Sequence, residues 1–189
     1  NMGASIYTID DFYSDPLYMR HKALDKMEWM DKHGNHPGKR THPDKHDSVK
    51  HAFEDVLGKK ITTWDAEWNT HSGCYNLCTQ QDRCWIHTDH GTDWAVVIYL
   101  TPDAPLSTGT GLYKHKKTGY RVQPEDKALQ KEIAKDGLDF TAWEMTDYIG
   151  NVFNRAVIYE GKFFHAATQY FGHSSEYCRL HQTFFFHTE

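Results

Sequence analysis

The feature that most constrains the fold is a series of short β-type segments that occupies the chain from about residue 61 onward. These segments are rich in β-branched and aromatic residues and are separated by Gly, Pro and polar clusters. Many short strands punctuated in this way are typical of a β sandwich or barrel. An aromatic content of 14% suits a β-rich core around a lined cavity. The expected strands cover residues 61–70, 73–80, 84–89, 94–101, 109–116, 154–161, 163–171 and 178–188.

Helices are expected before and within this β region. Pro16 follows Asp15 and precedes apolar residues at helical spacing, so a helix should begin there. A second helix should run over residues 48–60 and be closed by Gly58. Residues 124–137 start with proline and acidic residues and end with lysine and glycine, which predicts one helix inserted among the strands.

The chain of 189 residues is most simply a single domain. A helical N-terminal layer, residues 1 to about 60, would pack against a double-sheet β core over about residues 61–189, with the helical insertion near 124–137. No apolar run approaches the roughly 18 residues that a membrane span needs. The first residues also lack the basic and apolar regions of a signal peptide. We therefore expect a cytoplasmic protein with reduced cysteines and no membrane partner.

The net charge of −5 provides no global basic field, so a nucleic-acid partner is not expected. The more informative stretch is WIHTDHGTDW, residues 85–94, which precedes an apolar run. In an extended segment His87 and Asp89 project to one face, while Thr88 and His90 project to the other. An imidazole and a carboxylate side by side can occupy two adjacent positions on one divalent metal. Alone this pair is a weak signal, because the chain has 14 histidines.

A third ligand is available in the apolar segment FFHAATQYF, where His165 would need a polar partner if it were buried. Two histidines and one carboxylate form a facial triad that leaves three metal positions open, the arrangement found in non-haem Fe(II) oxygenases. We therefore select His87, Asp89 and His165 as candidate metal ligands and catalytic residues.

The last expected strand contains Arg179, and residues 179, 181, 183 and 185 share one of its faces. An arginine that projects from an otherwise apolar strand needs an anion, and its planar fork binds a carboxylate bidentately. Arg155, in the strand before His165, is a competing candidate for the same role.

In this order and spacing the motifs resemble the 2-oxoglutarate/Fe(II)-dependent oxygenase superfamily, in particular its prolyl 4-hydroxylase-like branch. The resemblance covers about residues 70–187 and implies a double-stranded β-helix (jelly-roll or cupin-like) core that is mainly β with flanking helices. The N-terminal segments 10–24 and 37–41 also look like a group of poorly characterised bacterial and phage members. The motifs are W-x-H-x-D (85–89), V-V-I-Y-L (96–100), T-G-T-G (108–111), N-R-A-V-I-Y (154–159), F-F-H-A-A (163–167) and R-L-H-Q-T-F-F-F (179–186).

The resemblance implies roles for individual residues. His87, Asp89 and His165 would hold Fe(II), and Arg179 would bind the distal carboxylate of 2-oxoglutarate. Hydroxyl groups of Tyr75, Tyr99 and Thr183 match positions that help to bind this co-substrate. With O2, such a site couples decarboxylation of 2-oxoglutarate to C–H hydroxylation. Asp89 favours hydroxylation, since halogenating relatives lack this carboxylate.

Two other interpretations remain open at this stage. Cys74, Cys78, Cys84 and His87 could hold a structural zinc ion in a binding module. Alternatively, the same fold could serve as a non-catalytic metal-binding jelly-roll module. The substrate, whether peptidyl, an amino acid or another small molecule, is not identified. The basic loop over residues 32–46 has two interpretations, a solvated loop or a segment that helps to bind an anionic substrate.

Overall fold

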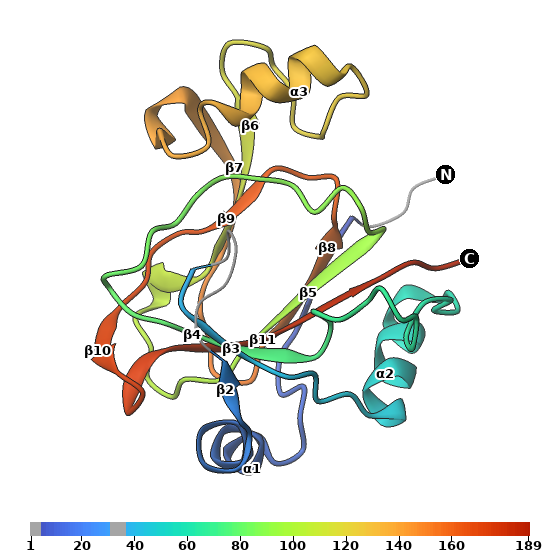
Figure 1. Ribbon diagram of the computed structural model, residues 1–189, viewed down its shortest axis with the longest axis vertical. Coiled ribbons are helices and arrows are strands. Elements are labelled where there is room, and N and C mark those ends of the chain that lie inside the picture. Colours follow the sequence, from blue (N-terminus) through green and yellow to red (C-terminus); the bar gives the residue numbers. More distant parts are fainter. Residues whose placement is uncertain (1–4, 31–36) are drawn as a thin grey trace.

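Two antiparallel β sheets face each other in the computed structural model, which describes residues 5–30 and 37–189 (Figure 1). The major sheet has the order β1-β8-β5-β11-β4-β3-β2, with β10 also paired to β11, and the minor sheet has the order β7-β6-β9. This confirms a mainly β, double-sheet core with flanking helices. The strands are β1 Ile6–Ile9, β2 Trp29–Met30, β3 Lys39–Thr41, β4 Cys74–Cys78, β5 Trp94–Tyr99, β6 Thr110–His115, β7 Trp143–Ile149, β8 Ala156–Glu160, β9 His165–Ala167, β10 Gly172–Ser174 and β11 Tyr177–Phe186.

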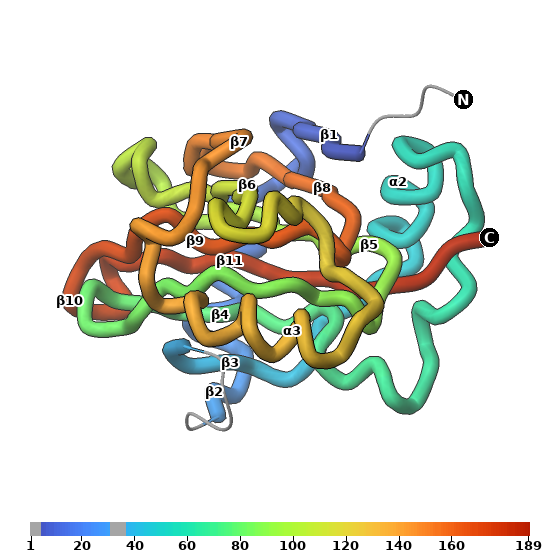
Figure 2. The backbone as a smooth tube through the Cα atoms, turned by 90° about the horizontal axis from the view of Figure 1, so that it is seen from above, coloured from blue at the N-terminus to red at the C-terminus, as the bar shows by residue number. Residues whose placement is uncertain are grey.

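The central strand of the major sheet is β11, which pairs with β4 on one side and β5 on the other. Figure 2 shows β11 running along the molecule beside these two strands. Its side chains alternate between the two faces of the sheet. Leu180, Phe184 and Phe186 face the outer core, whereas Arg179 and Thr183 face the space between the sheets.

The helices begin and end close to where the sequence predicts. Helix α1 spans Pro16–His21 with an Asp15 cap, and a π-helical segment η1, Lys22–Lys26, continues it. Helix α2 spans Asp47–Leu57 and is closed by Gly58 at φ 64°, a left-handed conformation that glycine adopts without strain. The inserted helix α3 spans Lys127–Ala134. Short 3₁₀ turns, η2 Leu106–Thr108 and η3 Phe140–Ala142, complete the helical elements of the described chain.

Three expectations about strands were wrong. Residues 61–70 form turns, closed by the Asn69 side chain, which donates to two backbone carbonyls; only Ile61 makes a β bridge. The N-terminal region is not purely helical, because β1 extends the major sheet at one edge and β2 and β3 extend it at the other. Residues 84–89 form no regular strand, and His87 alone bridges to His165. Strand β7 of the minor sheet was not among the expected strands.

The core is divided by the sheets. Phe53 of α2 packs with Trp64 and with Phe184 and Phe186 of β11 on the outer face of the major sheet. Helix α3 covers the minor sheet through Ile133, which lies in a cluster with aromatic residues of β6, β7 and the β8–β9 connection. Among residues 5–30 and 37–189, no helix is both long and apolar enough to cross a bilayer.

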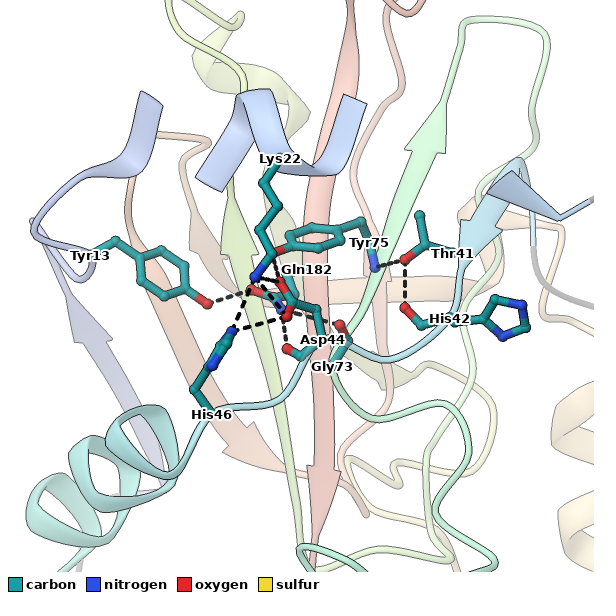
Figure 3. A network of polar contacts seen from close by, with 9 residues as sticks. All are labelled: Tyr13, Lys22, Thr41, His42, Asp44, His46, Gly73, Tyr75 and Gln182. Atoms are coloured by element: carbon teal, nitrogen blue, oxygen red, sulfur yellow. Dashed lines mark hydrogen bonds and ion pairs between the residues drawn. The ribbon is translucent and has the colours of Figure 1, made fainter. Parts of the chain in front are cut away.

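A polar network interrupts the outer core and is centred on the carboxylate of Asp44 (Figure 3). This carboxylate accepts from the Tyr75 hydroxyl at 2.6 Å, the Lys22 ammonium at 2.9 Å and the His46 ring at 3.0 Å. Gln182 of β11 donates to the backbone carbonyl of Asp44 at 3.1 Å. The network therefore fastens the segment that follows β3 against β4 and β11.

We predict that Asp44→Asn lowers the free energy of unfolding by about 1.5–3 kcal/mol at neutral pH, the range for hydrogen bonds to a charged group. Burial acts to raise the pKa of Asp44, but its bonds to Tyr75 and Lys22 outweigh burial and lower the net pKa. A lowered folded-state pKa stabilises the protein above the unfolded-state value of about 3.9, and this contribution is lost as pH falls through the folded-state pKa.

Urea unfolding at several pH values checks this prediction. The difference between wild type and Asp44→Asn should be constant above about pH 5 and shrink in more acidic solution. Asp65→Asn is the control, because that side chain is 84% exposed. A difference that grew in acid would contradict the assignment.

Candidate metal centre

The candidate ligands come together because two distant segments pair through their backbones. The amide of His87 donates to the carbonyl of His165 at 3.0 Å, and the reverse bond measures 2.9 Å. The amide of Asp89 then donates to the carbonyl of Gly161 at 2.7 Å. A Cβ atom at Gly161 would lie 2.4 Å from the Asp89 carbonyl oxygen, so this close approach requires glycine.

His87, Asp89 and His165 form a compact cluster in which one potential ligand atom from each lies within 4.8 Å of the others. The Nε2 atom of His87 is 3.8 Å from one Asp89 oxygen, and that of His165 is 3.0 Å from the other. No other group of three or more His, Cys, Asp or Glu side chains in the described ranges is close enough to share an ion. The side chains of His87 and Asp89 therefore reach the same cluster, although residues 84–89 form no regular strand.

Backbone carbonyls orient both imidazole rings. The Nδ1 atoms of His87 and His165 lie 3.0 and 2.9 Å from the carbonyl oxygens of Trp85 and Phe163. A carbonyl only accepts, so each Nδ1 carries the hydrogen and each Nε2 faces the cluster. This outer contact is typical of metal-binding histidines, since it fixes the ring and its tautomer. The Trp85 ring also stacks on His87, with ring centroids 4.2 Å apart.

The three groups influence one another's protonation. Burial and the neighbouring His165 lower the pKa of His87 to about 4, so its Nε2 lone pair is free at neutral pH. Burial also acts to lower the pKa of His165, but the charge and hydrogen bond of Asp89 outweigh it and raise the net pKa. The same histidine lowers the pKa of Asp89 against the effect of burial. Because a ligating imidazole must be neutral, metal binding would compete with protonation of His165.

A cavity of about 320 Å³ opens beside the cluster, between the two sheets. This volume lies within the range of small-molecule sites. Basic, aromatic and small polar side chains line it together with the three candidate ligands. They include Arg40, Asn76, Cys78, Trp85, Thr110, Tyr159, Tyr170, Arg179, His181 and Thr183.

Arg179 is buried in the wall of this cavity, at 3% exposure. Its guanidinium donates to the carbonyls of Thr108 and Gly109 at 3.0 and 3.2 Å and contacts the Nδ1 atom of His181 at 3.1 Å. The rings of Tyr99 and Tyr170 flank it at 5.4 and 5.5 Å. These partners are all neutral, and no carboxylate of the described residues forms an ion pair with Arg179.

The other sequence-predicted binding residues lie in different surroundings. Arg155 pairs with Asp10 at 2.7 Å, outside the residues that line the cavity. Thr183 lines the cavity, and its hydroxyl is 3.3 Å from the Asn76 amide. Tyr99 lies beneath Arg179, and its hydroxyl is bonded to Thr110 at 2.6 Å.

Tyr75 does not reach the cavity. It projects to the outer face of β4, where its hydroxyl belongs to the Asp44 network, while Asn76 and Cys78 of the same strand line the cavity. The expectation that Tyr75 faces a co-substrate is therefore corrected by strand alternation.

The structure does not assemble the alternative zinc set. Cys74, Cys78 and Cys84 are free thiols, and they do not join His87 in a ligand cluster within the described part of the chain. Several cavity residues were not selected as site residues from the sequence, among them His181 and Tyr170 beside Arg179. His181 could have been found, because it shares the β11 face with Arg179. Tyr170 lies beyond β9, where no periodicity indicates its direction.

Comparison with protein families identifies the chain. A model for a family described as "Family of unknown function (DUF6445)" matches residues 1–175. The chain belongs to the DUF6445 family. Among curated proteins, none matches it.

Solved structures share the fold of this DUF6445 protein. HygX from Streptomyces hygroscopicus, with nickel, 2-oxoglutarate and hygromycin B bound, aligns with a TM-score of 0.58 and 10% identity over 95% of this chain and 81% of HygX. HygX with nickel and 2-oxoglutarate bound gives a TM-score of 0.54 and 8% identity over the same shares. A prolyl hydroxylase from Trichoplax adhaerens, in complex with a hypoxia inducible factor peptide fragment, gives 0.49 and 12% over 96% and 83%. The HygX likeness confirms the double-stranded β-helix fold predicted from the sequence.

For this DUF6445 protein we predict that His165→Ala weakens binding of Ni²⁺ or Mn²⁺ by at least about 100-fold, because it removes one of three ligands, a larger loss than that of an outer contact. Isothermal titration calorimetry measures the change. The matched control is His90→Ala, since His90 contacts Thr88 and lies outside the ligand cluster. Equal losses in the two variants would contradict a metal centre at this cluster.

Proposed function

We propose that this protein is a 2-oxoglutarate- and Fe(II)-dependent oxygenase that couples decarboxylation of 2-oxoglutarate to hydroxylation of a C–H bond. The observation that carries the proposal is one cavity that contains both the His87, Asp89 and His165 cluster and the buried Arg179 guanidinium. A metal-binding module without a reaction would need the cluster but not the arginine. The combination therefore favours an enzyme over the non-catalytic alternative.

The donor atoms fit Fe(II). Two imidazole nitrogens and one carboxylate suit this ion and leave open positions for other ligands. A bound Fe(II) ion would supply the redox chemistry with O2, which side chains alone do not provide. His87 and Asp89 are each about a quarter exposed as side chains, whereas His165 is 6% exposed, so the ligand set is accessible from the cavity side.

Arg179 is prepared to bind a carboxylate. A guanidinium has five N–H donors, and three are used by Thr108, Gly109 and His181. The two that remain lie one on each terminal nitrogen, which suits the two oxygens of the distal carboxylate of 2-oxoglutarate. Because its present partners are neutral, its positive charge is available to the co-substrate.

His181 would add a third donor beside Arg179. An arginine only donates, so the Nδ1 atom of His181 must accept the 3.1 Å contact. The neutral ring then carries its hydrogen on Nε2. Burial and the adjacent arginines hold the pKa of His181 well below its usual value, so the ring is uncharged at neutral pH. Thr183, two residues along the same face of β11, would offer a hydroxyl, while Tyr99 would position Arg179 rather than contact the co-substrate.

The order of the sequence motifs supports placing the proposal in the prolyl 4-hydroxylase-like branch. The presence of Asp89 supports hydroxylation. HygX, which shares the fold, was solved with the small molecule hygromycin B. The substrate of this chain is accordingly proposed to be a small molecule or a peptidyl or amino-acid side chain.

The decisive experiment is anaerobic titration of the protein with Fe(II) and 2-oxoglutarate, monitored by the weak visible charge-transfer band of the chelate. Wild type should form the band, and His165→Ala should not. Arg179→Gln should form it only at about 10- to 100-fold higher 2-oxoglutarate, the equivalent of one lost charge-assisted interaction.

Arg155→Gln is the matched control, because it removes an arginine that pairs with Asp10 outside the cavity. Its titration should coincide with that of wild type. If folded, metal-loaded wild type forms no band, the oxygenase proposal is wrong and the non-catalytic metal-binding module is favoured.

A further inference from the structure

A second arginine lies in the same cavity and has no role in the proposed binding of metal or co-substrate. Arg40 is in β3, which lies between β4 and the edge strand β2 of the major sheet, and it lines the cavity together with Asp89. It is paired in register with Asn76, which is paired in turn with His181 of β11. A row of polar side chains therefore crosses the sheet from Arg40 towards Arg179.

Arg40 has only neutral partners. Its Nε atom donates to the Asn76 amide oxygen at 3.1 Å, and one terminal nitrogen contacts the Nδ1 atom of His71 at 2.9 Å. Three of its five N–H donors remain unused by these contacts. Within residues 5–30 and 37–189, no carboxylate forms an ion pair with it.

In the loaded site the positive charge of Arg40 has no matching negative charge, an inference that rests on the proposed function. A divalent metal, the Asp89 carboxylate, dianionic 2-oxoglutarate and Arg179 together carry no net charge. Arg40 adds one positive charge to this neutral set in a half-buried position. A charge held away from water is costly unless an anion pairs with it. One negative charge on a further ligand would complete the balance.

A second cleft shows where such a ligand would enter. It has a volume of about 340 Å³ and shares Arg40, Asp89 and Phe185 with the metal cavity. Its other wall includes His71 and Trp68, a residue that is 57% exposed. Because His71 accepts from Arg40 through Nδ1, its Nε2 carries a hydrogen and is a further donor. A substrate entering along this cleft would pass Arg40 on its way to the metal centre.

We propose that Arg40 is a specificity residue that binds a carboxylate of the primary substrate, with His71 beside it, while the rest of the substrate extends towards the His87, Asp89 and His165 cluster. A carboxylate is favoured over a phosphomonoester because a single positive charge is unmatched. The substrate class is thus a carboxylic acid, such as an amino acid or a chain with a free carboxyl terminus.

The test uses the full chain loaded with Mn²⁺ and 2-oxoglutarate, and two probes of nearly equal shape, N-acetylglycine and neutral N-acetylglycinamide. Proton NMR measures how strongly the paramagnetic ion relaxes the acetyl methyl group of each probe, relative to the Zn²⁺-loaded protein. Wild type should relax the methyl group of N-acetylglycine about tenfold more, the ratio expected for one charge-assisted hydrogen-bonded contact. Methyl phosphate is the third probe and should be relaxed less than N-acetylglycine.

Arg40→Gln should abolish the preference for N-acetylglycine, and Arg40→Lys should retain part of it. Lys39→Gln, which changes the exposed neighbouring residue of β3, should behave as wild type. The inference is overturned if wild type relaxes the two glycine probes equally, a comparison that needs no variant to fold. It is also overturned if the preference persists in Arg40→Gln, or if methyl phosphate is relaxed most.

Binding of 2-oxoglutarate, measured by calorimetry before any probe is added, distinguishes a failure of the proposed function from a failure of the role assigned to Arg40. Arg40→Gln should bind 2-oxoglutarate as tightly as wild type does, whereas Arg179→Gln should bind it more weakly. If Arg40→Gln alone loses this binding, Arg40 holds the co-substrate and the inference is wrong while the oxygenase proposal stands. If metal-loaded wild type does not bind 2-oxoglutarate, the proposed function and the inference fail together.

Discussion

The alternation of side chains along β11 is the constraint on which the rest of the structure depends. Even-numbered residues of β11, such as Leu180 and Phe184, lie in the outer core with residues of α2. Gln182, on the same face, binds the segment after β3. The odd-numbered residues Arg179 and His181 face the cavity. A shift of the β11 register by one residue would turn Arg179 and His181 into the apolar core and Phe184 and Phe186 towards the cavity. Stability and function therefore select the same register.

This coupling explains why a polar network is tolerated in the outer core. The Asp44 carboxylate has three donors, so the cost of its partial burial is offset by hydrogen bonds. Through Gln182 and Tyr75 the network reaches the backs of β11 and β4, whose opposite faces carry His181 and Asn76. It also fixes the chain immediately after β3, and β3 carries Arg40. The network thus holds the wall of the cavity without contributing an atom to it.

Features that depend on residues close together in the sequence could be predicted, and features that depend on residues far apart could not. Helices α1 and α2 are encoded by local caps and spacing, and the pairing of His87 with Asp89 needs only alternation over three residues. That His165 approaches them depends on a backbone bridge across 78 residues, which the sequence suggests only through its resemblance to a family. The direction of Tyr75 was mispredicted because a strand segment does not reveal which of its faces meets the cavity. Strands β1, β2 and β3, at the two ends of the major sheet, are too short to show a period, so the placement of Arg40 could not be inferred at all.

The two cavity arginines differ in how their positive charge is stabilised, and this difference favours an order in which two anionic ligands would bind. Arg179 is almost fully enclosed, with two aromatic rings against its faces and carbonyl oxygens at its edge, so little reorganisation is needed when an anion arrives. Arg40 lies nearer the open cleft and has more unused donors. A ligand bound first at Arg179 would neutralise the inner charge and leave Arg40 as the remaining attraction for a second anion. Electrostatics alone would then favour co-substrate in the inner position and substrate in the outer one, an order of loading suited to a site where the reaction requires both.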